Sequence, residues 1–433
     1  MKVYFYTSTN ITYNLQSMSI FVPFKAFRPT QENAKSVASK PYDVLNAKEA
    51  KLEAEGNPVS FYNVIKPEIN FPEDSNYYAP EVYLKGKEKF DALVNGNIIK
   101  QDTSNSYYVY ELTMDGHVQT GLVGCCAIDD YFNNAIKKHE LTRPDKEEDR
   151  KNHIRYSKLN YEAVFLSYPQ VDAIDNLVND VKNNDVIYDF VADDGIRHRL
   201  WSIDKKNTLE QIESLFQSDV PSIYIADGHH RTAAGALIGQ ELRDSRNGNS
   251  NDNGRDNYFM AVVFPDNQLK VLDYNRVVKD LNGLSEDELM GKLQESFNIE
   301  QKESEYRPET MHTFGMYMNN KWYKLTSKQG TYNDEDPVGQ LDVTILSSNI
   351  LEPIFNIVDL RKDKRIDFVG GMRGLGELEK RVNSGEMKVA FSMYPVSMKQ
   401  LISISNNDLI MPPKVTWFEP KLRSGLFVHN LDE

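Results

Sequence analysis

Five consecutive residues, Asp227-Gly228-His229-His230-Arg231, combine an acid, two imidazoles and a guanidinium. Apolar and β-branched residues precede them and helix-forming residues follow, so the pattern predicts a strand that passes directly into a helix. The first N–H groups of such a helix lack partners and carry the positive end of its dipole. Because Gly228 permits close backbone approach and Arg231 adds a bidentate fork, the segment predicts an anion site suited to phosphate.

Asp227 is the predicted catalytic base, because a carboxylate in this pocket can accept the proton of a substrate hydroxyl. His230 is a further catalytic candidate, and Gly228, His229 and Arg231 are predicted to bind phosphate or substrate. Adjacent residues point about 100° apart around a helix, which disfavours binding of one metal ion by both histidines. The structural alternative is an N-cap aspartate followed by exposed histidines.

A second cluster, HELTRPDKEEDR at residues 139–150, supplies His139, Thr142 and Arg143 as substrate-binding candidates and Glu140 as the rival base. A charged run of this kind is commonly a solvated surface. The proline at 144 favours instead an ordered loop that enters a site. Residue 143 is arginine, so the segment is not a His-Glu-x-x-His zinc motif. Asp227 and Glu140 are the predicted ligands of a Mg²⁺ ion, and no organic cofactor is expected.

The C-terminal stretch MPPKVTWFEPKLRSGL, residues 411–426, is stiffened by prolines and carries Lys414, Thr416 and Lys421. Its basic groups either close over a polyphosphate or lie on the surface. The glycine-rich stretch 367–377 matches neither a dinucleotide fingerprint nor a P-loop. Lys414, Thr416 and Lys421 complete the set of residues that are predicted to bind phosphate.

Mixed alternation of helical and strand patterns predicts an α/β (α+β) fold with mixed sheets and flanking helices. Two domains are expected, over residues 18–215 with the HELT motif and 216–433 with the Asp-Gly-His-His-Arg turn. Residues 1–17 are predicted to be a flexible or non-native leader, because a second methionine follows at 18. The polar tract 243–257 predicts a mobile surface loop, and residues 342–355 predict one long helix.

The amino-acid composition narrows the classes of function that are expected for this protein. Of 433 residues, 40% are hydrophobic and 26% charged, which is typical of a folded globular protein. The net charge of -14 disfavours nucleic-acid binding. The sequence lacks an apolar run long enough to cross a membrane, and its two adjacent cysteines, Cys125 and Cys126, predict a reduced, cytoplasmic protein without a disulfide. Oligomeric state stays open.

Four separated motifs occur in one order: PYDV at 41–44, HELT with DR at 149–150, IADGHHR at 225–231, and the C-terminal MPPKVTWFEPKLRSGL. In this order they resemble the bacterial family called domain of unknown function 1015. The turn also resembles the phosphate-binding turn of the ParB and sulfiredoxin-like superfamily, which implies a core of that kind around it. Val415 and Trp417 depart from the serine and tyrosine that are commoner in the family.

Relatives of this family include diphosphate-dependent serine kinases, so the resemblance implies phosphoryl transfer between diphosphate, or a nucleotide, and free L-serine. The implied active-site turn is Asp227 with His229, His230 and Arg231, and the implied second wall is His139, Glu140 and Thr142. Two alternatives stay open. One is a ParB-like nucleotide-binding regulator without turnover, and the other is a metal-dependent hydrolase that uses His139, Glu140, His229 and His230.

Overall fold

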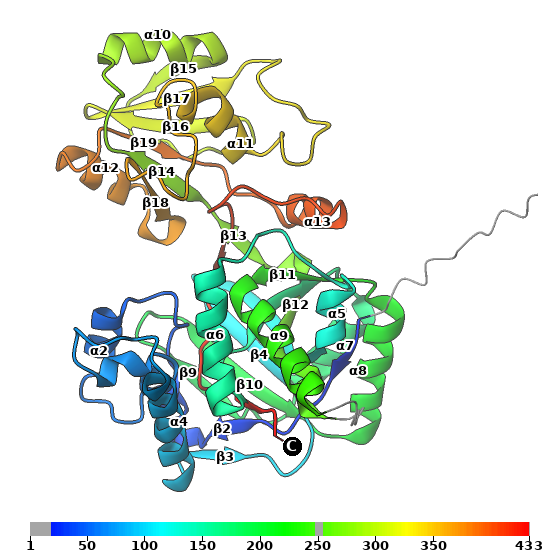
Figure 1. Cartoon of the computed structure of the whole chain (residues 1–433). Coiled ribbons are helices and arrows are strands. Elements are labelled where there is room, and N and C mark those ends of the chain that lie inside the picture. Colours follow the sequence, from blue (N-terminus) through cyan, green and yellow to red (C-terminus); the bar gives the residue numbers. More distant parts are fainter. Residues whose placement is uncertain (1–18, 247–253, 433) are drawn as a thin grey trace, which may run out of the picture.

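A computed structural model describes residues 19–246 and 254–432 as two lobes joined by extended chain (Figure 1). The larger lobe holds a mixed sheet of strand order β6-β11-β8-β12-β5-β4-β10-β9, with β1 paired to β5. β11 runs parallel to β6 and β12 runs parallel to β8, whereas the other pairs are antiparallel. The strands are β1 (Phe21–Val22), β4 (Tyr107–Met114), β5 (His117–Ala127), β6 (Ile136–Lys137), β8 (Val164–Tyr168), β9 (Tyr188–Val191), β10 (Arg197–Ile203), β11 (Ile223–Asp227) and β12 (Tyr258–Pro265).

Alternate side chains of β4 enter two different cores, as the two-residue period of a strand requires. Tyr107 and Val109 pack in a core with Ile174 of α7 and Phe216 of α8, whereas Tyr108 packs in a core that continues into the smaller lobe. α6 and α9 lie side by side against the sheet (Figure 1). The helices of this lobe are α1 (Ala34–Val37), α2 (Ala47–Ala54), α3 (Tyr62–Ile65), α4 (Pro80–Asn95), α5 (Ile128–Phe132), α6 (Pro144–Ser157), α7 (Asp172–Val181), α8 (Lys206–Asp219) and α9 (His229–Ser245).

The smaller lobe is built on an antiparallel sheet of order β15-β17-β16-β19-β14-β18. Ser285 caps α10 through a reciprocal capping box with Glu288, as its sequence pattern predicts. The elements are β14 (Tyr274–Val278), α10 (Glu286–Ser296), β15 (Phe297–Lys302), β16 (Thr313–Met318), β17 (Lys321–Ser327), α11 (Asp342–Leu346), β18 (Ile366–Gly370), α12 (Gly376–Asn383), β19 (Val389–Ser392) and α13 (Met398–Asn406).

After α13 the chain returns to the larger lobe. β20 (Trp417–Glu419) pairs with β13 (Lys270–Leu272), and β21 (His429–Asn430) pairs with β7 (Leu159–Asn160). Between these pairings, single bridges join Ser424 to Ser39 and Val428 to Phe27, and β2 (Phe27–Pro29) itself pairs with β3 (Ile99–Gln101). Leu426 and Phe427 enter the same core as Tyr108. The stretch from Leu422 to Leu431 therefore packs into the larger lobe.

The predicted fold class, mixed α/β sheets with flanking helices, is confirmed. The predicted division at residue 216 is wrong, because β11 and β12 pair with β8 and β5 inside one sheet. The predicted helix 342–355 is also wrong in length, since α11 passes into a π-helical stretch at Ser347–Leu351 and then into turns. The leader 1–17 and residues 247–253 of the polar tract lie outside the described residues. The described flanks of that tract are the end of α9 and a 3₁₀ turn at Arg255–Asn257.

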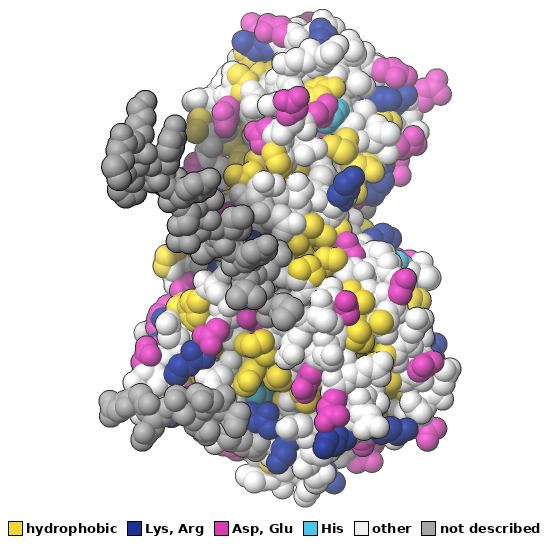
Figure 2. All heavy atoms as spheres, turned by 90° about the vertical axis from the view of Figure 1, so that its right-hand side faces the viewer, with side chains coloured by type: hydrophobic (Ala, Val, Ile, Leu, Met, Phe, Trp, Pro, Cys, Tyr) yellow, Lys and Arg dark blue, Asp and Glu magenta, His cyan; other side chains and the backbone are white. Residues whose placement is uncertain are grey.

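Basic and acidic side chains intermix on the face of the molecule in Figure 2, among scattered hydrophobic ones. Neither sign forms a broad field on this face, as the moderate excess of acidic residues in the sequence leads one to expect. Over residues 19–246 and 254–432, no helix combines the length and the apolar character that crossing a membrane requires.

We expect Leu426→Ala to lower the free energy of unfolding by about 2–5 kcal/mol, because the side chain is fully buried and the substitution leaves a cavity. Val358→Ala is the matched control, since Val358 is 70% exposed and its truncation changes stability little. Urea unfolding of both variants measures the effect. Equal stabilities of the two variants would contradict the assignment of the C-terminal segment to the core.

Candidate functional site

The turn between β11 and α9 has the geometry that its sequence predicts. β11 ends at Asp227, Gly228 adopts a left-handed conformation with φ +94°, and α9 begins at His229. A Cβ atom on Gly228 would lie 2.9 Å from Nε of Arg231, so both the backbone angle and the available space require glycine. The turn therefore places the Asp227 carboxylate next to the N-terminus of α9, whose first N–H groups have no partner within the helix.

Asp227 lies between two cations. Its Oδ2 is 2.9 Å from Nη2 of Arg231, and its Oδ1 is 3.4 Å from Nζ of Lys421. Burial alone raises the pKa of Asp227, but Lys421 and Arg231 outweigh burial and lower the pKa to about 2. Asp227 is consequently ionised at neutral pH and holds both cations beside the helix N-terminus.

The HELT loop packs directly against this turn. The backbone N–H of His139 donates to Nε2 of His229 at 3.5 Å, and the N–H of Arg143 donates to Nε2 of His230 at 2.9 Å. The rings of His139 and His229 meet edge to face with centroids 4.4 Å apart. Two neutral imidazoles of α9 thus fasten a loop that lies about 90 residues away in sequence.

The histidines are held in their neutral forms. Burial lowers the pKa of His139 to about 4, and burial together with the neighbouring His139 lowers the pKa of His229 well below its usual range. Burial is also the largest cause of the lowered pKa of His230. Neutral imidazole offers one acceptor nitrogen, which is the role that His229 and His230 play toward the loop.

Glu140 is half-buried beside this turn, and it forms no ion pair among the described residues. Burial raises its pKa, and Asp227 raises it further, whereas Lys414 and Arg361 lower it. The carboxylate of Glu140 therefore has a higher proton affinity than the carboxylate of Asp227, although the two lie in the same region of the structure. The side chains of Thr142 and Arg143 bind within their own segment, Thr142 to Glu147 at 2.8 Å and Arg143 to Asp145 at 2.7 Å.

The C-terminal segment supplies the second cation. Glu419 accepts hydrogen bonds from Nε1 of Trp417 at 2.9 Å and from the N–H of Lys421 at 3.0 Å, which directs the Lys421 side chain toward Asp227. Burial of Lys421 lowers its pKa, but Asp227 and neighbouring carboxylates raise it above the usual value. Lys414 is exposed and Thr416 is half-buried. The positive charge of Lys414 lowers the pKa of Glu140.

Asp43, in the PYDV motif, is a residue that the sequence reasoning missed as part of this site. It is exposed, yet its charge raises the pKa of His230, Arg231 and Lys421. The loop that carries it is fixed by Glu162, which accepts the N–H of Tyr42 and the hydroxyl of Ser424, each at 3.1 Å. The PYDV motif at 41–44 was the sequence signal from which Asp43 could have been assigned to this site.

The structure brings Asp227, Gly228, Arg231, Glu140 and Lys421 to one place. It buries His139 and His229 against each other, and it turns the side chains of Thr142 and Arg143 to partners in their own segment. In the part of the chain that the structure describes, no three His, Cys, Asp or Glu side chains gather as metal ligands. The hydrolase grouping does not gather as a set of metal ligands among the described residues: Nε2 of His229 and Nε2 of His230 accept backbone N–H groups, and both ring nitrogens of His139 lack a hydrogen-bond partner.

Residues 21–344 match the family described as "Protein of unknown function (DUF1015)", and the chain belongs to that family. No curated protein has significant similarity to the sequence.

Three solved structures are similar to the chain. A free serine kinase in complex with AMP has 14% identity and a TM-score of 0.34 and covers 69% of this chain and 89% of its own. SbnI with a C-terminal truncation, from Staphylococcus aureus, has 12% identity, a TM-score of 0.38 and coverage of 71% and 87%. A conserved hypothetical protein from Pyrococcus furiosus has 14% identity, a TM-score of 0.33 and coverage of 68% and 92%.

The buried histidine pair generates a prediction about pH. The pKa of His139 is about 4 when folded and about 6.5 when unfolded, so between these values the unfolded chain binds one more proton at this residue. Its contribution to stability is therefore lost as pH falls from 6.5 toward 4. His139→Phe removes this linkage and also removes two buried ring nitrogens that lack hydrogen-bond partners.

We expect the advantage of His139→Phe over the wild type to grow by about 2 kcal/mol when the pH falls from about 7 to about 5. Guanidinium unfolding of both proteins at the two pH values measures it. Comparing variant with wild type cancels the contributions of all other titrating groups that the substitution leaves unchanged. The same pH dependence in both proteins would contradict a neutral, buried His139.

Proposed function

We propose that this protein is a phosphotransferase that transfers a phosphoryl group from diphosphate, or from an adenine nucleotide, to the hydroxyl of free L-serine. The observation that carries the proposal is the ionised Asp227 held between Arg231 and Lys421 at the N-terminus of α9. Helix N–H groups, a guanidinium and an ammonium together neutralise phosphate charge, which is the main requirement of phosphoryl transfer. The acceptor is proposed because the four motifs resemble a family whose relatives include serine kinases.

The donor phosphates are proposed to bind over Gly228. The left-handed Gly228 has no Cβ and so makes room for the Arg231 guanidinium beside the N-terminus of α9. Arg231 uses Nη1 on the carbonyl of Ala163 at 3.1 Å and Nη2 on Asp227, so it is held rigidly beside this position. Lys414, exposed on the C-terminal segment, adds a further positive charge near Glu140.

Glu140, rather than Asp227, is proposed as the base. Both oxygens of Asp227 face cations and its pKa is about 2, so it accepts a proton poorly at neutral pH. Burial raises the pKa of Glu140, and no cation of residues 19–246 or 254–432 forms an ion pair with it, which suits a general base. The serine oxygen attacks phosphorus, its proton passes to Glu140, and the bond between phosphorus and the leaving phosphate oxygen breaks. Asp227 then serves to hold Arg231 and Lys421.

A Mg²⁺ ion that accompanies the donor would be held mostly by the donor's own phosphate oxygens, because the Asp227 oxygens are already engaged by Arg231 and Lys421 and Glu140 serves as the base. Carboxylate and phosphate oxygens are the ligands that Mg²⁺ prefers, and one or two carboxylates commonly suffice. When bound, the ion would neutralise phosphate charge. Arg231 and Lys421 orient the phosphates, and Glu140 orients the acceptor.

Phosphorus NMR of the purified protein with Mg²⁺ and L-serine, supplied in parallel with diphosphate, ATP or ADP, tests the proposed activity. We expect O-phosphoserine to form with one donor. Glu140→Gln should then lower kcat by roughly 10²–10⁴-fold, as the loss of a general base does. Glu210→Gln, on the exposed face of α8, is the matched control and should leave turnover unchanged.

If the folded protein consumes none of the three donors, the phosphotransferase proposal fails. Binding of a nucleotide without turnover would point instead to a nucleotide-binding regulator built on the same turn. Full activity in Glu140→Gln, with loss of activity in Asp227→Asn, would return the role of base to Asp227.

A further inference from the structure

We propose that Glu162 is a positioning residue of the Asp227 site, because its buried carboxylate joins the two segments that bring Asp43 and Lys421 to this site. Glu162 is 8% exposed and takes no part in the chemical step proposed above. It connects the PYDV loop, which carries Asp43, to the C-terminal segment, which carries Lys421. The inference deepens the proposed function and rests on it, since it assumes that the donor phosphates bind beside Arg231 and Lys421.

One oxygen of Glu162 holds both segments. Its Oε1 accepts the backbone N–H of Tyr42 at 3.1 Å and the hydroxyl of Ser424 at 3.1 Å. Asp43 directly follows Tyr42, and Lys421 lies three residues before Ser424. Because both bonds end on the same atom, a displacement of the Glu162 carboxylate would disturb both segments together.

The residue next to Glu162 holds Arg231. The carbonyl of Ala163 accepts Nη1 of Arg231 at 3.1 Å, so the backbone just before β8 fixes this guanidinium as well. Burial lowers the pKa of the guanidinium, whereas Asp43, Asp227 and Glu162 raise it, which indicates that these carboxylates lie near it. Residues 162–163 therefore set where Arg231 lies relative to the PYDV loop and the C-terminal segment.

A buried cation compensates the charge of Glu162. Nη1 of Arg150 lies 3.5 Å from Oε2 of Glu162, and the guanidinium carbon lies 3.8 Å from the centroid of the Tyr42 ring. Nη2 of Arg150 also binds Asp149 at 2.8 Å, and Asp149 accepts the hydroxyl of Tyr83 at 2.9 Å. The Asp149-Arg150 pair of the sequence motif thus belongs to a buried network that holds Glu162 in place.

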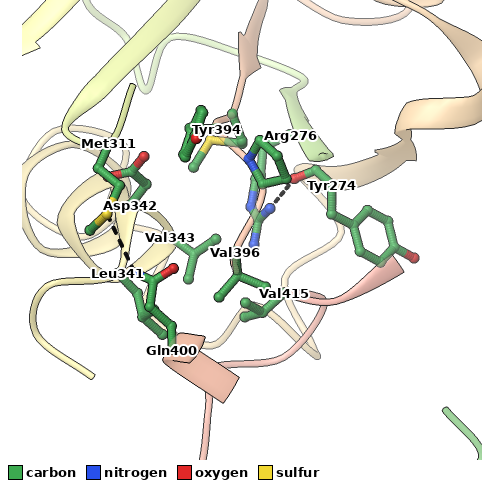
Figure 3. A pocket seen from close by; sticks show the side chains of 12 residues that line it. Tyr274, Arg276, Met311, Leu341, Asp342, Val343, Tyr394, Val396, Gln400 and Val415 are labelled. Atoms are coloured by element: carbon green, nitrogen blue, oxygen red, sulfur yellow. Dashed lines mark hydrogen bonds between the residues drawn. The ribbon is translucent and has the colours of Figure 1, made fainter. Parts of the chain in front are cut away.

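The segment that carries Lys421 has a second anchor in the smaller lobe. Nη2 of the buried Arg276 donates to the carbonyl of Lys414 at 2.9 Å, and Val415 lies on the wall of the narrow pocket that Arg276 also lines (Figure 3). Lys421 therefore lies between two anchored points, one at Lys414 and one at Ser424. A segment held on both sides of its lysine restricts where the ammonium can reach, which preorganises it for binding.

Isothermal titration of the full chain with inorganic diphosphate and Mg²⁺ tests this role. We expect Glu162→Gln to weaken diphosphate binding roughly tenfold, because its amide must turn an NH₂ group either toward Arg150 or toward the N–H of Tyr42. Lys421→Met should also weaken binding. Adding Glu162→Gln to Lys421→Met should then weaken it little further, since the lysine that Glu162 positions is gone.

Ser424→Ala is a milder variant, which keeps the test valid if Glu162→Gln fails to fold. It removes the hydroxyl that Glu162 accepts, leaves both buried charges in place, and should weaken diphosphate binding about threefold. Ser392→Ala is the matched control, because Ser392 is also buried and donates one hydrogen bond, to the carbonyl of Tyr306 at 2.9 Å in the smaller lobe. This control should bind diphosphate as the wild type does, although it too loses a buried hydrogen bond.

Hydrogen–deuterium exchange without ligand measures the positioning directly. In Glu162→Gln, residues 40–46 and 418–426 should exchange faster than in the wild type, whereas β16 and β17 should exchange at unchanged rates. The proposal is overturned if neither segment changes its exchange, or if the wild type fails to bind diphosphate at millimolar concentration. It is also overturned if Glu162→Gln and Ser424→Ala bind diphosphate as the wild type does, or if Ser392→Ala weakens binding as much as Ser424→Ala.

Formation of O-phosphoserine is measured separately, so the two proposals fail in different ways. Diphosphate binding that depends on Glu162, without any transfer to L-serine, would overturn the proposed reaction and support the positioning role. Transfer to L-serine that Glu162→Gln leaves at its wild-type rate and KM would support the reaction and overturn the positioning role.

Discussion

The arrangement of the site depends on the contact of one carboxylate with two cations. Asp227 comes from the end of β11, Arg231 from the first turn of α9, and Lys421 from a segment that follows the whole smaller lobe. The pair formed by Asp227 and Arg231 is local, four residues apart on one turn. The contact with Lys421 instead joins two distant parts of the chain, so it requires the C-terminal segment to be packed in its place.

Burial, together with the neighbouring charges, sets the proton affinity of the carboxylates at this contact. A carboxylate in a dry environment tends to be protonated, and here the two cations reverse that tendency for Asp227 while burial prevails for Glu140. Two carboxylates in one region thereby acquire different proton affinities. The neutral histidines follow the same principle, because desolvation keeps His139 and His229 uncharged. Nε2 of the neutral His229 can then accept the backbone N–H of His139 in the loop.

The C-terminal segment connects the lobes chemically as well as covalently. Its Lys421 reaches Asp227, the carbonyl of its Lys414 accepts from the buried Arg276, and its Leu426 completes the core of the larger lobe. A shift of this segment would therefore alter the surroundings of both Asp227 and Arg276. Its prolines limit such movement, since each fixes one backbone angle.

The sequence by itself determined the features that depend on neighbouring residues: the strand-to-helix turn at Asp227, the glycine that it requires and the cap at Ser285. Hydrophobic period and side-chain capping act over a few residues, so the local pattern is sufficient to predict them. The motif order also indicated which distant segments matter, including HELT and the C-terminal stretch.

Only the tertiary structure decided where those segments meet. Contacts between residues far apart in sequence produce the strand pairing across the predicted division at 216 and the burial of His139 and Arg276. Such contacts also place Asp43 near Arg231. Burial and strand partners are properties of the folded chain as a whole. They set the proton affinities of Asp227 and Glu140, and for that reason the difference between these two carboxylates could not be read from residue types alone.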